Sequence, residues 1–484
     1  MCRNFVTQRL SPVLLLLVVG GSVVSGRVWA EQPAGDAARS TPIHIGSRLE
    51  LFVDEFLVEK LGGEAALQVQ CPEPQEVVLV TDRPWEGNTC AYFTIFRDGD
   101  LFRMYYRGSH ADEKTHKATH REVTCYAESR DGVHWYRPKL GLFEFNGSKE
   151  NNIVWDGIGT HDFTPFRDTN PQCKPEARYK AIARGRPRGK KGLYVFRSPD
   201  GIHWSMIRKE PVITIGAFDS QNLAFWDSHA GVYREYHRTF DQGVRAIMTC
   251  TSKDFIHWTR PVLLKYPGAP KEHLYTNAIL PYPRAPHILI GFPTRFLPKE
   301  GSRVEPTFMA SRDGVVFRRW LKPVIPKDAP AERSGNRSNY MAWGLVQLPG
   351  DTRHYSVYAT ESYYTGKSSR LRRFTYRVDG FVALGAGRKG GTLLTKPIVF
   401  SGKRLILNFR TSPKGHVRAE LQSVDGTPLK QFELRNCQPL KGDSIEQPVV
   451  WNSTNSDLSA LAGKPVRLLL EVVDAQIFSF RFSN

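Results

Sequence analysis

The chain has 484 residues, a formal charge of +19 at pH 7 and seven cysteines. This length suffices for two domains, or for one large β architecture with a smaller companion. The cysteines are scattered and form no C-x-x-C pair, which excludes a dense disulfide framework and a zinc-finger pattern. The positive charge agrees with an anionic partner, but the chain has no helix-turn-helix, zinc-finger or ribonucleoprotein motif, so we expect no nucleic-acid partner.

Residues 1–30 have the pattern of a secretory signal peptide. Arg3 and Arg9 supply a positive start, residues 14–19 form an apolar run, and a small-residue cleavage site follows. The run is too short to cross a bilayer as a mature helix, so we expect no stable membrane insertion. Retention of the segment as an N-terminal anchor is the alternative. Cleavage would leave a secreted or periplasmic protein with a charge of about +16 and a flexible leader over residues 31–42.

A short motif recurs along the chain and indicates a repeated fold. It combines Ser-x-Asp-Gly with a tryptophan three residues after the glycine, and such copies begin at Ser129 and Ser198. The copy at Ser252 has phenylalanine in place of the glycine, a looser copy begins at Ser311, and a degenerate fifth begins at Val378. Repeats of this size with strand-like flanks are typical of β-propeller blades. Asp and Gly suit a tight turn between two strands. We expect Trp135, Trp204 and Trp258 to be largely buried between neighbouring blades.

The segments between the copies alternate apolar and polar residues as β-strands do, and long helical periodicity is absent. We therefore predict an all-β fold with a five-bladed β-propeller over residues 43–384. A Gly-rich linker over residues 385–392 and a β-sandwich over residues 393–484 are expected to follow. Residues 43–58 are expected to supply a strand that helps to close the ring.

Polar side chains gather at the predicted starts of the innermost strands, which converge near the axis of a propeller. Carboxylates and amides beside aromatic rings suit a sugar, whose hydroxyls need paired donors and acceptors. The candidate catalytic residues are Glu86, Asp162 and Asp219. The candidate substrate-binding residues are Trp85, His161, Gln221, Asn222, Glu272, His273, Asn277 and Asn339. We therefore predict a carbohydrate site at the centre of the ring.

With these strand starts, the chain resembles the five-bladed propeller glycoside hydrolases, the superfamily of invertases, levansucrases and arabinanases. More narrowly, it is similar to bacterial secreted proteins described as family 32-like. The resemblance covers roughly residues 45–385. It implies one carboxylate on each of the first three blades, with Glu86 as base or nucleophile, Asp162 as transition-state stabiliser and Asp219 as general acid. The invertase Trp-x-Asn-Asp-Pro motif is absent, and that family has Glu as its acid, so we do not expect fructosidase activity.

Three classes of function remain open at this point. The first is a glycoside hydrolase that uses paired carboxylates, and the second is a glycan-binding propeller without catalysis. The third is a structural propeller that binds a protein partner, for which apolar strand starts would be expected. His161 and His273 each adjoin a carboxylate and offer a site for a central cation, but hydrogen-bonded histidines are the favoured interpretation. We predict no metal and no cofactor.

The charge of the substrate is a separate question. Several arginines fall on or near the expected inner and second strands: Arg107, Arg238, Arg295 and Arg337. A guanidinium group matches sulfate or carboxylate in shape and stays charged at any working pH. These arginines favour an anionic glycan as the partner. The alternative is that the surplus charge only keeps an exported protein soluble.

Overall fold

The computed structural model describes residues 41–328, 339–452 and 456–484. The predicted signal peptide, nearly all of the predicted leader, and Arg337 lie outside the described residues. The described part consists of β-strands, turns and four short 3₁₀ segments. No helix in these three ranges is long and apolar enough to cross a membrane.

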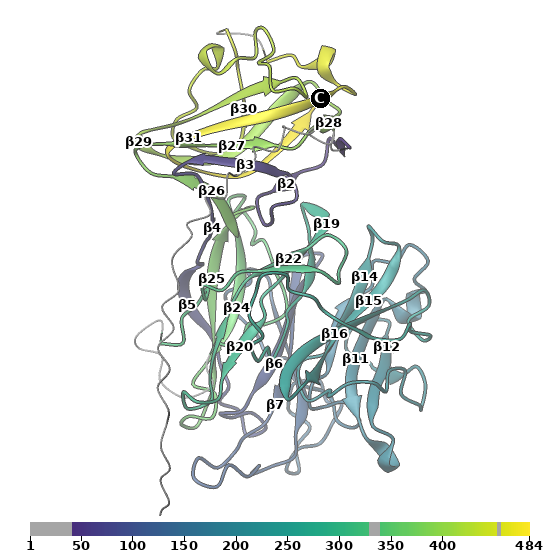
Figure 1. The fold of residues 1–484 in the computed structure, drawn as a ribbon. Helices are drawn as coiled ribbons and strands as arrows, with labels where there is room; N and C mark the ends of the chain where they lie inside the picture. The colour runs from purple at the N-terminus through teal and green to yellow at the C-terminus, as the bar shows by residue number, and fades with distance from the viewer. Residues whose placement is uncertain (1–40, 329–338, 453–455) are drawn as a thin grey trace, which may run out of the picture. The chain divides into compact units, whose positions relative to one another are not determined.

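The protein is a five-bladed β-propeller, and its first three blades each contain four consecutive antiparallel strands (Figure 1). Blade one contains β6 (Ala91–Asp98), β7 (Leu101–Gly108), β8 (Val123–Ser129) and β9 (Ile153–Trp155). Blade two contains β10 (Thr164–Arg167), β11 (Tyr179–Gly185), β12 (Gly192–Ser198) and β13 (Ser205–Met206). Blade three contains β14 (Leu223–Asp227), β15 (Val232–Asp241), β16 (Val244–Ser252) and β17 (Val262–Leu263). The predicted all-β propeller is confirmed.

The last two blades depart from this simple order. Blade four contains β18 (Leu280–Tyr282), β19 (Ala285–Gly291), β22 (Met309–Ser311) and β23 (Phe317–Arg319), with the hairpin β20 (Thr294–Leu297) and β21 (Arg303–Pro306) inserted. Blade five contains β24 (His354–Glu361), β25 (Arg370–Arg377) and β5 (Glu73–Val80). Because β5 precedes blade one in the sequence and pairs with β25 of blade five, it closes the ring.

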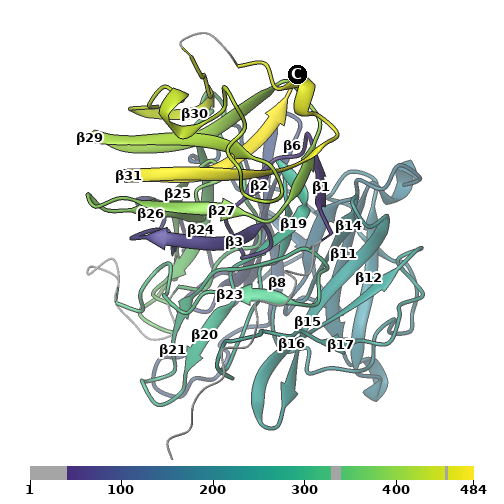
Figure 2. The same ribbon diagram turned by 45° about the horizontal axis from the view of Figure 1, so that its top comes forward.

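The expectation that residues 43–58 help to close the ring is wrong. The strands before β5 are β1 (Ile43–Gly46), β2 (Glu50–Leu51), β3 (Val58–Gly63) and β4 (Ala66–Val69). They pair with β28 (Ile398–Phe400), β31 (Pro465–Ser483), β27 (Gly391–Thr395) and β26 (Val382–Ala386) (Figure 2). The physical reason is packing, because Ile45, Phe52 and Leu57 belong to the apolar core built by the C-terminal strands.

The C-terminal strands form a ten-stranded network of pairings with a core of their own. Its longest pair joins β29 (Arg404–Gln422) to β31, and β30 (Asp443–Pro448) pairs with β29. The β-sandwich expected over residues 393–484 stays a prediction. The Gly-rich segment expected to be a linker over residues 385–392 instead comprises the end of β26, a turn over residues 387–390 and the start of β27. Gly391 is needed there because a Cβ atom would lie 2.2 Å from the backbone nitrogen of Ala65.

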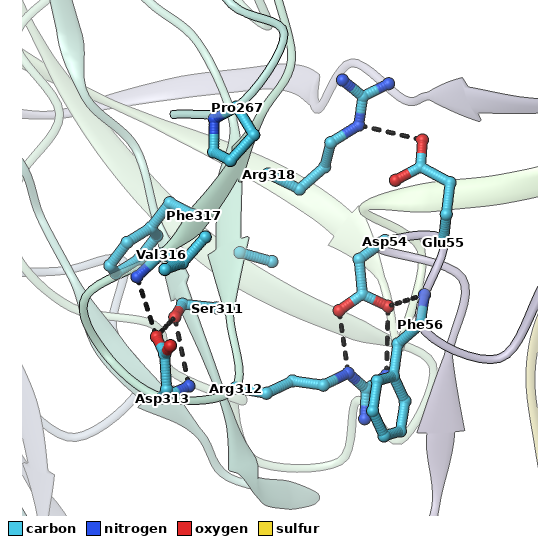
Figure 3. Close-up of a pocket in the computed structure, with 11 residues that line it drawn as sticks. Asp54, Glu55, Phe56, Pro267, Ser311, Arg312, Asp313, Val316, Phe317 and Arg318 are labelled. Carbon is cyan, nitrogen blue, oxygen red and sulfur yellow. Dashed lines mark hydrogen bonds and ion pairs between the residues drawn. The ribbon is translucent and has the colours of Figure 1, made fainter. Parts of the chain in front are cut away.

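A pocket of about 580 Å³ lies where residues 54–56 meet blade four (Figure 3). Arg312 donates two hydrogen bonds to the Asp54 carboxylate and one to Glu50. Its guanidinium group also lies 4.2 Å from the ring centroid of Phe56. The polar groups of this pocket largely satisfy one another, so we interpret it as the attachment of the N-terminal strands to blade four.

The repeated motif forms a tight turn after a strand, as predicted, and the structure places this turn between the third and fourth strands of a blade. In blade two, Ser198 accepts the Gly201 backbone N–H at 2.8 Å, and Asp200 accepts the backbone N–H groups of Ile202 and His203. These contacts span only a few residues. The turn is therefore determined by its local sequence.

The motif glycine also joins neighbouring blades. The Gly201 carbonyl accepts a hydrogen bond from the Tyr105 hydroxyl of blade one at 2.9 Å, and the Gly314 carbonyl accepts one from Tyr236 of blade three. Gly201 has a φ of +80°, and a Cβ atom there would lie 2.8 Å from the Tyr105 hydroxyl. Only glycine combines this backbone conformation with so close an approach.

Two copies of the motif differ from the others. In blade three Phe255 replaces the glycine and adopts a φ of +69°. This strained conformation is offset by burial of its ring against Phe166 and Tyr233. The degenerate fifth copy is not a surface turn, because Asp379 is fully buried and accepts hydrogen bonds from Tyr282 and Ser479.

We expect the motif aspartates to contribute to the free energy of unfolding in a pH-dependent way. Burial raises the pKa of Asp200, but hydrogen bonds from His203 and the turn backbone outweigh it and lower the pKa to about 2. The pKa of an aspartate in the unfolded chain is about 3.9. The stabilising contribution is therefore complete above about pH 4 and is lost as the pH falls through about 2. We expect Asp200→Asn to destabilise the protein more at pH 7 than at pH 2.

Urea unfolding of both proteins at the two pH values measures this difference. Asp100→Asn, in the exposed turn between β6 and β7, is the matched control and should show no such difference. Equal destabilisation by Asp200→Asn at both pH values would contradict the expectation.

Candidate active site

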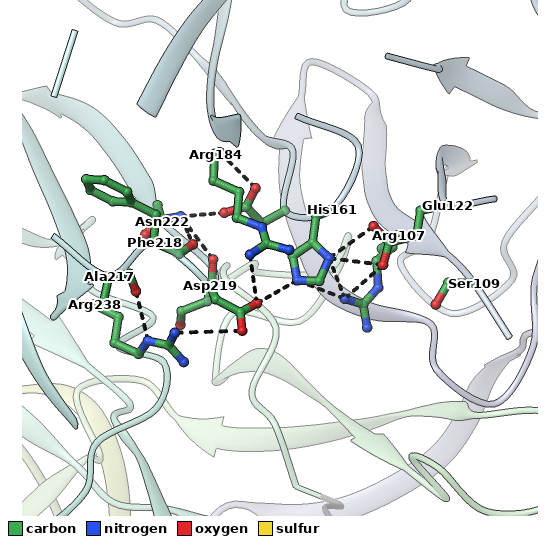
Figure 4. A network of polar contacts seen from close by, with 12 residues as sticks. Arg107, Ser109, Glu122, His161, Arg184, Ala217, Phe218, Asp219, Asn222 and Arg238 are labelled. Atoms are coloured by element: carbon green, nitrogen blue, oxygen red, sulfur yellow. Dashed lines mark hydrogen bonds and ion pairs between the residues drawn. The ribbon is translucent and has the colours of Figure 1, made fainter. Parts of the chain in front are cut away.

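Six ionisable side chains from the first three blades meet in one network, which we call the axial polar cluster (Figure 4). Its members are Arg107, Glu122, His161, Arg184, Asp219 and Arg238. They lie at or beside the starts of the inner strands, where the blades converge. The cluster includes two of the predicted catalytic or substrate-binding residues, His161 and Asp219, and two of the arginines predicted near the pocket, Arg107 and Arg238.

Asp219 is the carboxylate at the centre of the cluster. Its oxygens lie 2.9 Å from Nε2 of His161, 3.2 Å from the Arg184 guanidinium and 3.8 Å from the Arg238 guanidinium. The hydrogen bond from His161 and the charges of the two arginines hold the pKa of Asp219 well below its usual range. Half of the side chain is still exposed to solvent. Asp219 is therefore an ionised carboxylate that a ligand can reach.

His161 separates Asp219 from a second carboxylate, Glu122. Nδ1 of His161 lies 3.0 Å from the Glu122 oxygens, and Arg107 lies 3.7 Å from the same carboxylate. Burial raises the pKa of Glu122, but the hydrogen bond from His161 and the charges of Arg107 and Arg184 outweigh it and lower the pKa to about 2. The imidazole thus holds two ionised carboxylates apart, one on each ring nitrogen.

Asp162 lies behind the cluster and is fully buried. It accepts a hydrogen bond from the backbone N–H of Arg184 at 2.9 Å and another from the side-chain amide of Asn222. Burial raises the pKa of Asp162 to about 7. Because its oxygens face protein donors, Asp162 fixes the strand that carries Arg184 and the segment between Asp219 and Asn222.

Three of the arginines occupy equivalent places in successive blades. Arg107 lies on β7, Arg184 on β11 and Arg238 on β15, each near the end of the second strand that faces the start of the inner strand. Arg107 is almost fully buried and donates to the Thr89 carbonyl and the Tyr363 hydroxyl. The cluster has four groups that can carry positive charge and two that carry negative charge, so it retains a positive excess.

Tyrosine rings border the cluster. Tyr92, at the start of β6, lies with its ring 4.9 Å from the Arg107 guanidinium and 5.6 Å from the His161 ring. It adopts a φ of +56°, a strained conformation of the kind found at functional sites. Tyr340 contacts Tyr275 and Tyr363 edge-on, with ring centroids 5.5 Å apart in both pairs. Blades one, four and five thus supply an aromatic border to the polar residues of blades one to three.

Glu86 and Trp85 are not part of this cluster. The Glu86 carboxylate accepts hydrogen bonds from the Tyr106 hydroxyl at 2.5 Å and from Arg137 at 2.6 Å. Only 3% of the residue is exposed, and burial raises its pKa. Trp85 donates to the side-chain oxygen of Asn152. Both residues contact other parts of blade one, which favours a structural role for them.

Three of the amides predicted to bind substrate, Gln221, Asn222 and Asn277, make buried hydrogen bonds within the protein. Asn222 donates a hydrogen bond to Asp162. Gln221 donates to the backbone carbonyls of Tyr92 and Phe93 at 3.3 and 3.2 Å, and so ties blade three to blade one. Asn277 accepts the Ile279 backbone N–H. These buried contacts fix the inner strands.

The remaining predicted residues lie on blades four and five. Glu272 is ion-paired with Arg295 at 3.2 Å and with Arg319 at 2.6 Å. His273 accepts the backbone N–H of Arg245, and burial together with the Arg245 charge lowers its pKa. Asn339 donates to the Pro326 carbonyl. None of these contacts joins them to the axial polar cluster within the described ranges.

Sequence reasoning missed Glu122, Arg184 and Tyr92. A signal for Arg184 was present, because the antiparallel register pairs Thr164 with Ile182 and so sets Arg184 opposite Asp162. The arginines at the equivalent places of blades one and three, Arg107 and Arg238, were predicted from the sequence. Nothing local to Glu122 distinguishes it from a surface acid.

The fold and the cluster together define a β-propeller with a charged, aromatic-bordered site at the inner strand starts. No protein-family model matches the chain, and no curated protein sequence matches it. It is similar in structure to a protein described as a glycoside hydrolase, with 14% identity, 63% of this chain and 92% of that chain covered, and a TM-score of 0.44.

Two further solved structures are similar to this chain. One is a glycoside hydrolase family 43 arabinoxylan arabinofuranohydrolase from Bacillus subtilis, with 10% identity, 83% and 96% coverage and a TM-score of 0.42. The other is a β-1,2-mannobiose phosphorylase from Listeria innocua, with 12% identity, 62% and 96% coverage and a TM-score of 0.44. At this level of similarity, a function for this chain has to come from its own side chains.

Proposed function

We propose that the protein is a glycoside hydrolase in which Asp219 is the reacting carboxylate. The observation that carries this proposal is the position of Asp219, which is ionised, half-exposed and held by His161, Arg184 and Arg238. A carboxylate fixed by three donors is preorganised either to attack the anomeric carbon of a sugar or to take a proton from the water that attacks it. The signal-peptide pattern of residues 1–30 adds the proposal that this enzyme is exported.

The low pKa of Asp219 determines which role suits it. A general acid must carry a proton at working pH, and the cations around Asp219 oppose protonation. The environment therefore favours Asp219 as base or nucleophile over the acid role expected from the sequence. Asp162, with its raised pKa, is a positioning residue in this proposal because it is fully buried.

Glycan binding without hydrolysis is the second candidate. The observation that favours it is that Glu86 and Asp162 are buried, while Asp219 and Glu122 are both held ionised. Within the described residues, the cluster presents no exposed carboxyl group whose pKa is raised. A lectin would use the same hydroxyl-matching groups and tyrosines.

The experiment that separates the two candidates is incubation of the protein with neutral, uronic and sulfated oligosaccharides. Products are followed by chromatography, and binding is followed by calorimetry. Release of shorter sugars supports the hydrolase. Tight binding of a glycan that is never shortened supports the lectin.

We further propose that the glycan is anionic. Arg184 is the most exposed arginine of the cluster and shares Asp219 with Arg238, which leaves guanidinium N–H groups for a carboxylate or sulfate. A charge-assisted hydrogen bond contributes about 1.5–3 kcal/mol. We expect Arg184→Gln to weaken binding of an anionic oligosaccharide about tenfold or more, and to leave a neutral one nearly unchanged.

Calorimetric titrations at low and high salt measure this effect, because binding that depends on charge weakens as salt rises. Arg188→Gln is the matched control, since Arg188 is an exposed arginine of blade two outside the cluster. Equal affinity of the wild type for neutral and anionic glycans, without a salt effect, would leave the positive charge as surface charge only.

A further inference from the structure

A second cavity, of about 840 Å³, shares no lining residue with the axial polar cluster. Propeller residues line one part of it, from the β18–β19 turn and from the segment that leads into β24. Residues of β30 and β31 line the rest. All of these residues belong to the same compact unit, Pro42–Asn484. The charged and hydroxyl-bearing residues that line it include Arg284, Thr352, Arg353, Tyr355, Glu446 and Arg481.

Two of the arginines compete for one carboxylate. Arg284 and Arg481 both approach the same oxygen of Glu446, at 2.8 and 3.1 Å. Arg284 also lies 3.4 Å from Asp379, but that carboxylate already accepts hydrogen bonds from Ser479 and Tyr282. Each guanidinium has five N–H groups and can bind an anion with two of them. Glu446 therefore leaves much of their donor capacity unused.

A second carboxylate near Glu446 in the sequence, Asp443, is also shared by two arginines. Arg353 and Arg377 both donate to one oxygen of Asp443, Arg377 at 2.6 Å. Burial lowers the pKa of Arg377, and the charges of Arg353 and Arg410 lower it further against the effect of Asp443. Positive charges crowded around too few carboxylates create a local positive potential. A bound anion would lower this positive potential.

Uncharged hydrogen-bonding groups line the same cavity. Gln347, Thr352, Tyr355 and Ser444 contribute an amide and three hydroxyls. Within residues 41–328, 339–452 and 456–484, none of these four side chains has a hydrogen-bond partner. The volume is far larger than one inorganic anion needs and falls in the range of small-molecule sites. Arginines beside free amide and hydroxyl groups match a sugar that carries a negative group.

We propose that this cavity is a second glycan site, which binds a sulfated or uronic sugar residue through Arg284, Arg353 and Arg481. Tyr355 and Thr352 then bind the hydroxyls of the same sugar. This proposal goes beyond the function proposed for the axial polar cluster and does not depend on any catalytic step.

The test is calorimetric titration of the full protein with three tetrasaccharides: chondroitin sulfate, hyaluronan and maltotetraose. Chondroitin sulfate carries sulfate and carboxylate, hyaluronan carries carboxylate only, and maltotetraose is neutral. We expect the wild type to bind about two equivalents of an anionic tetrasaccharide. The double variant Arg353→Gln/Arg481→Gln should bind one, and Arg188→Gln should still bind two.

Variants of the two sites distinguish the two proposals. Arg184→Gln should weaken only the axial site, and Tyr355→Phe, which removes one hydroxyl, should weaken only the second site by about threefold or more. If the double variant binds as many equivalents as Arg188→Gln, this inference is wrong and the proposed function is untouched. If one equivalent is lost in the double variant but none is weakened by Arg184→Gln, the second site stands and the axial glycan site is wrong.

Two controls complete the design. Thermal melting of each variant shows whether it is folded, and Tyr355→Phe supplies the answer if the double variant is not. Inorganic sulfate is titrated in parallel. If sulfate binds as tightly as the sulfated tetrasaccharide, the cavity is an adventitious ion site only and the glycan proposal fails.

Discussion

Replacing Asp219 by asparagine is expected to lower turnover at least about a hundredfold while the protein stays folded and still binds its glycan. General acid–base groups contribute typically about 10²–10⁴-fold to rates, and loss of a nucleophile costs at least as much. Asparagine keeps the size of the side chain and can still accept a hydrogen bond from His161. It removes the negative charge that Arg184 and Arg238 hold in place. The expected loss is therefore chemical.

The measurement is kcat on a glycan that the wild type cleaves, together with the dissociation constant of the same glycan. Asp241→Asn is the matched control, because Asp241 is a partly exposed aspartate of the same blade that is ion-paired with Lys271. We expect this control to retain normal turnover. Near-normal turnover of Asp219→Asn would remove Asp219 as the reacting carboxylate and leave Glu122 as the other partly exposed carboxylate of the cluster.

Replacing Trp204 by alanine is expected to lower the free energy of unfolding by about 3 kcal/mol, the lower end of the range for large aromatic truncations. As the sequence predicted, most of the surface of Trp204 and of its equivalents Trp135 and Trp258 is buried, and each packs against a hydrophobic core. The Trp204 ring contacts Tyr105 of blade one and Phe163 edge-on, at 6.3 and 5.1 Å. Truncation would therefore open the junction between blades one and two.

Urea unfolding at neutral pH measures this loss. Tyr136→Ala is a suitable control, because Tyr136 is an aromatic residue beside the equivalent turn of blade one and is 63% exposed. We expect it to change stability by less than about 0.5 kcal/mol. A loss below about 1 kcal/mol for Trp204→Ala would show that these tryptophans do not hold neighbouring blades together.

The sequence was sufficient for the features that depend on short-range interactions. The serine and aspartate side chains of the turn accept hydrogen bonds from backbone N–H groups two or three residues later, so every good copy marks the same place in a blade. The alternation of apolar and polar residues identifies the strands, and His161 and Asp219 come just before the inner strands of blades two and three. Their contact at 2.9 Å agrees with the convergence expected for a propeller.

Only the tertiary structure determined the features that depend on contacts between segments far apart in the sequence. Glu86 lies in the predicted loop, but Arg137, 51 residues later, binds its carboxylate within blade one. Ring closure likewise depends on β5 pairing with β25 across nearly 300 residues, while β1 to β4 pair with the C-terminal strands. The sequence does not show which strand closes the ring and which strands join the C-terminal network, because the alternation of apolar and polar residues is similar in all of them. The choice follows from the packing of whole cores, which no local pattern contains.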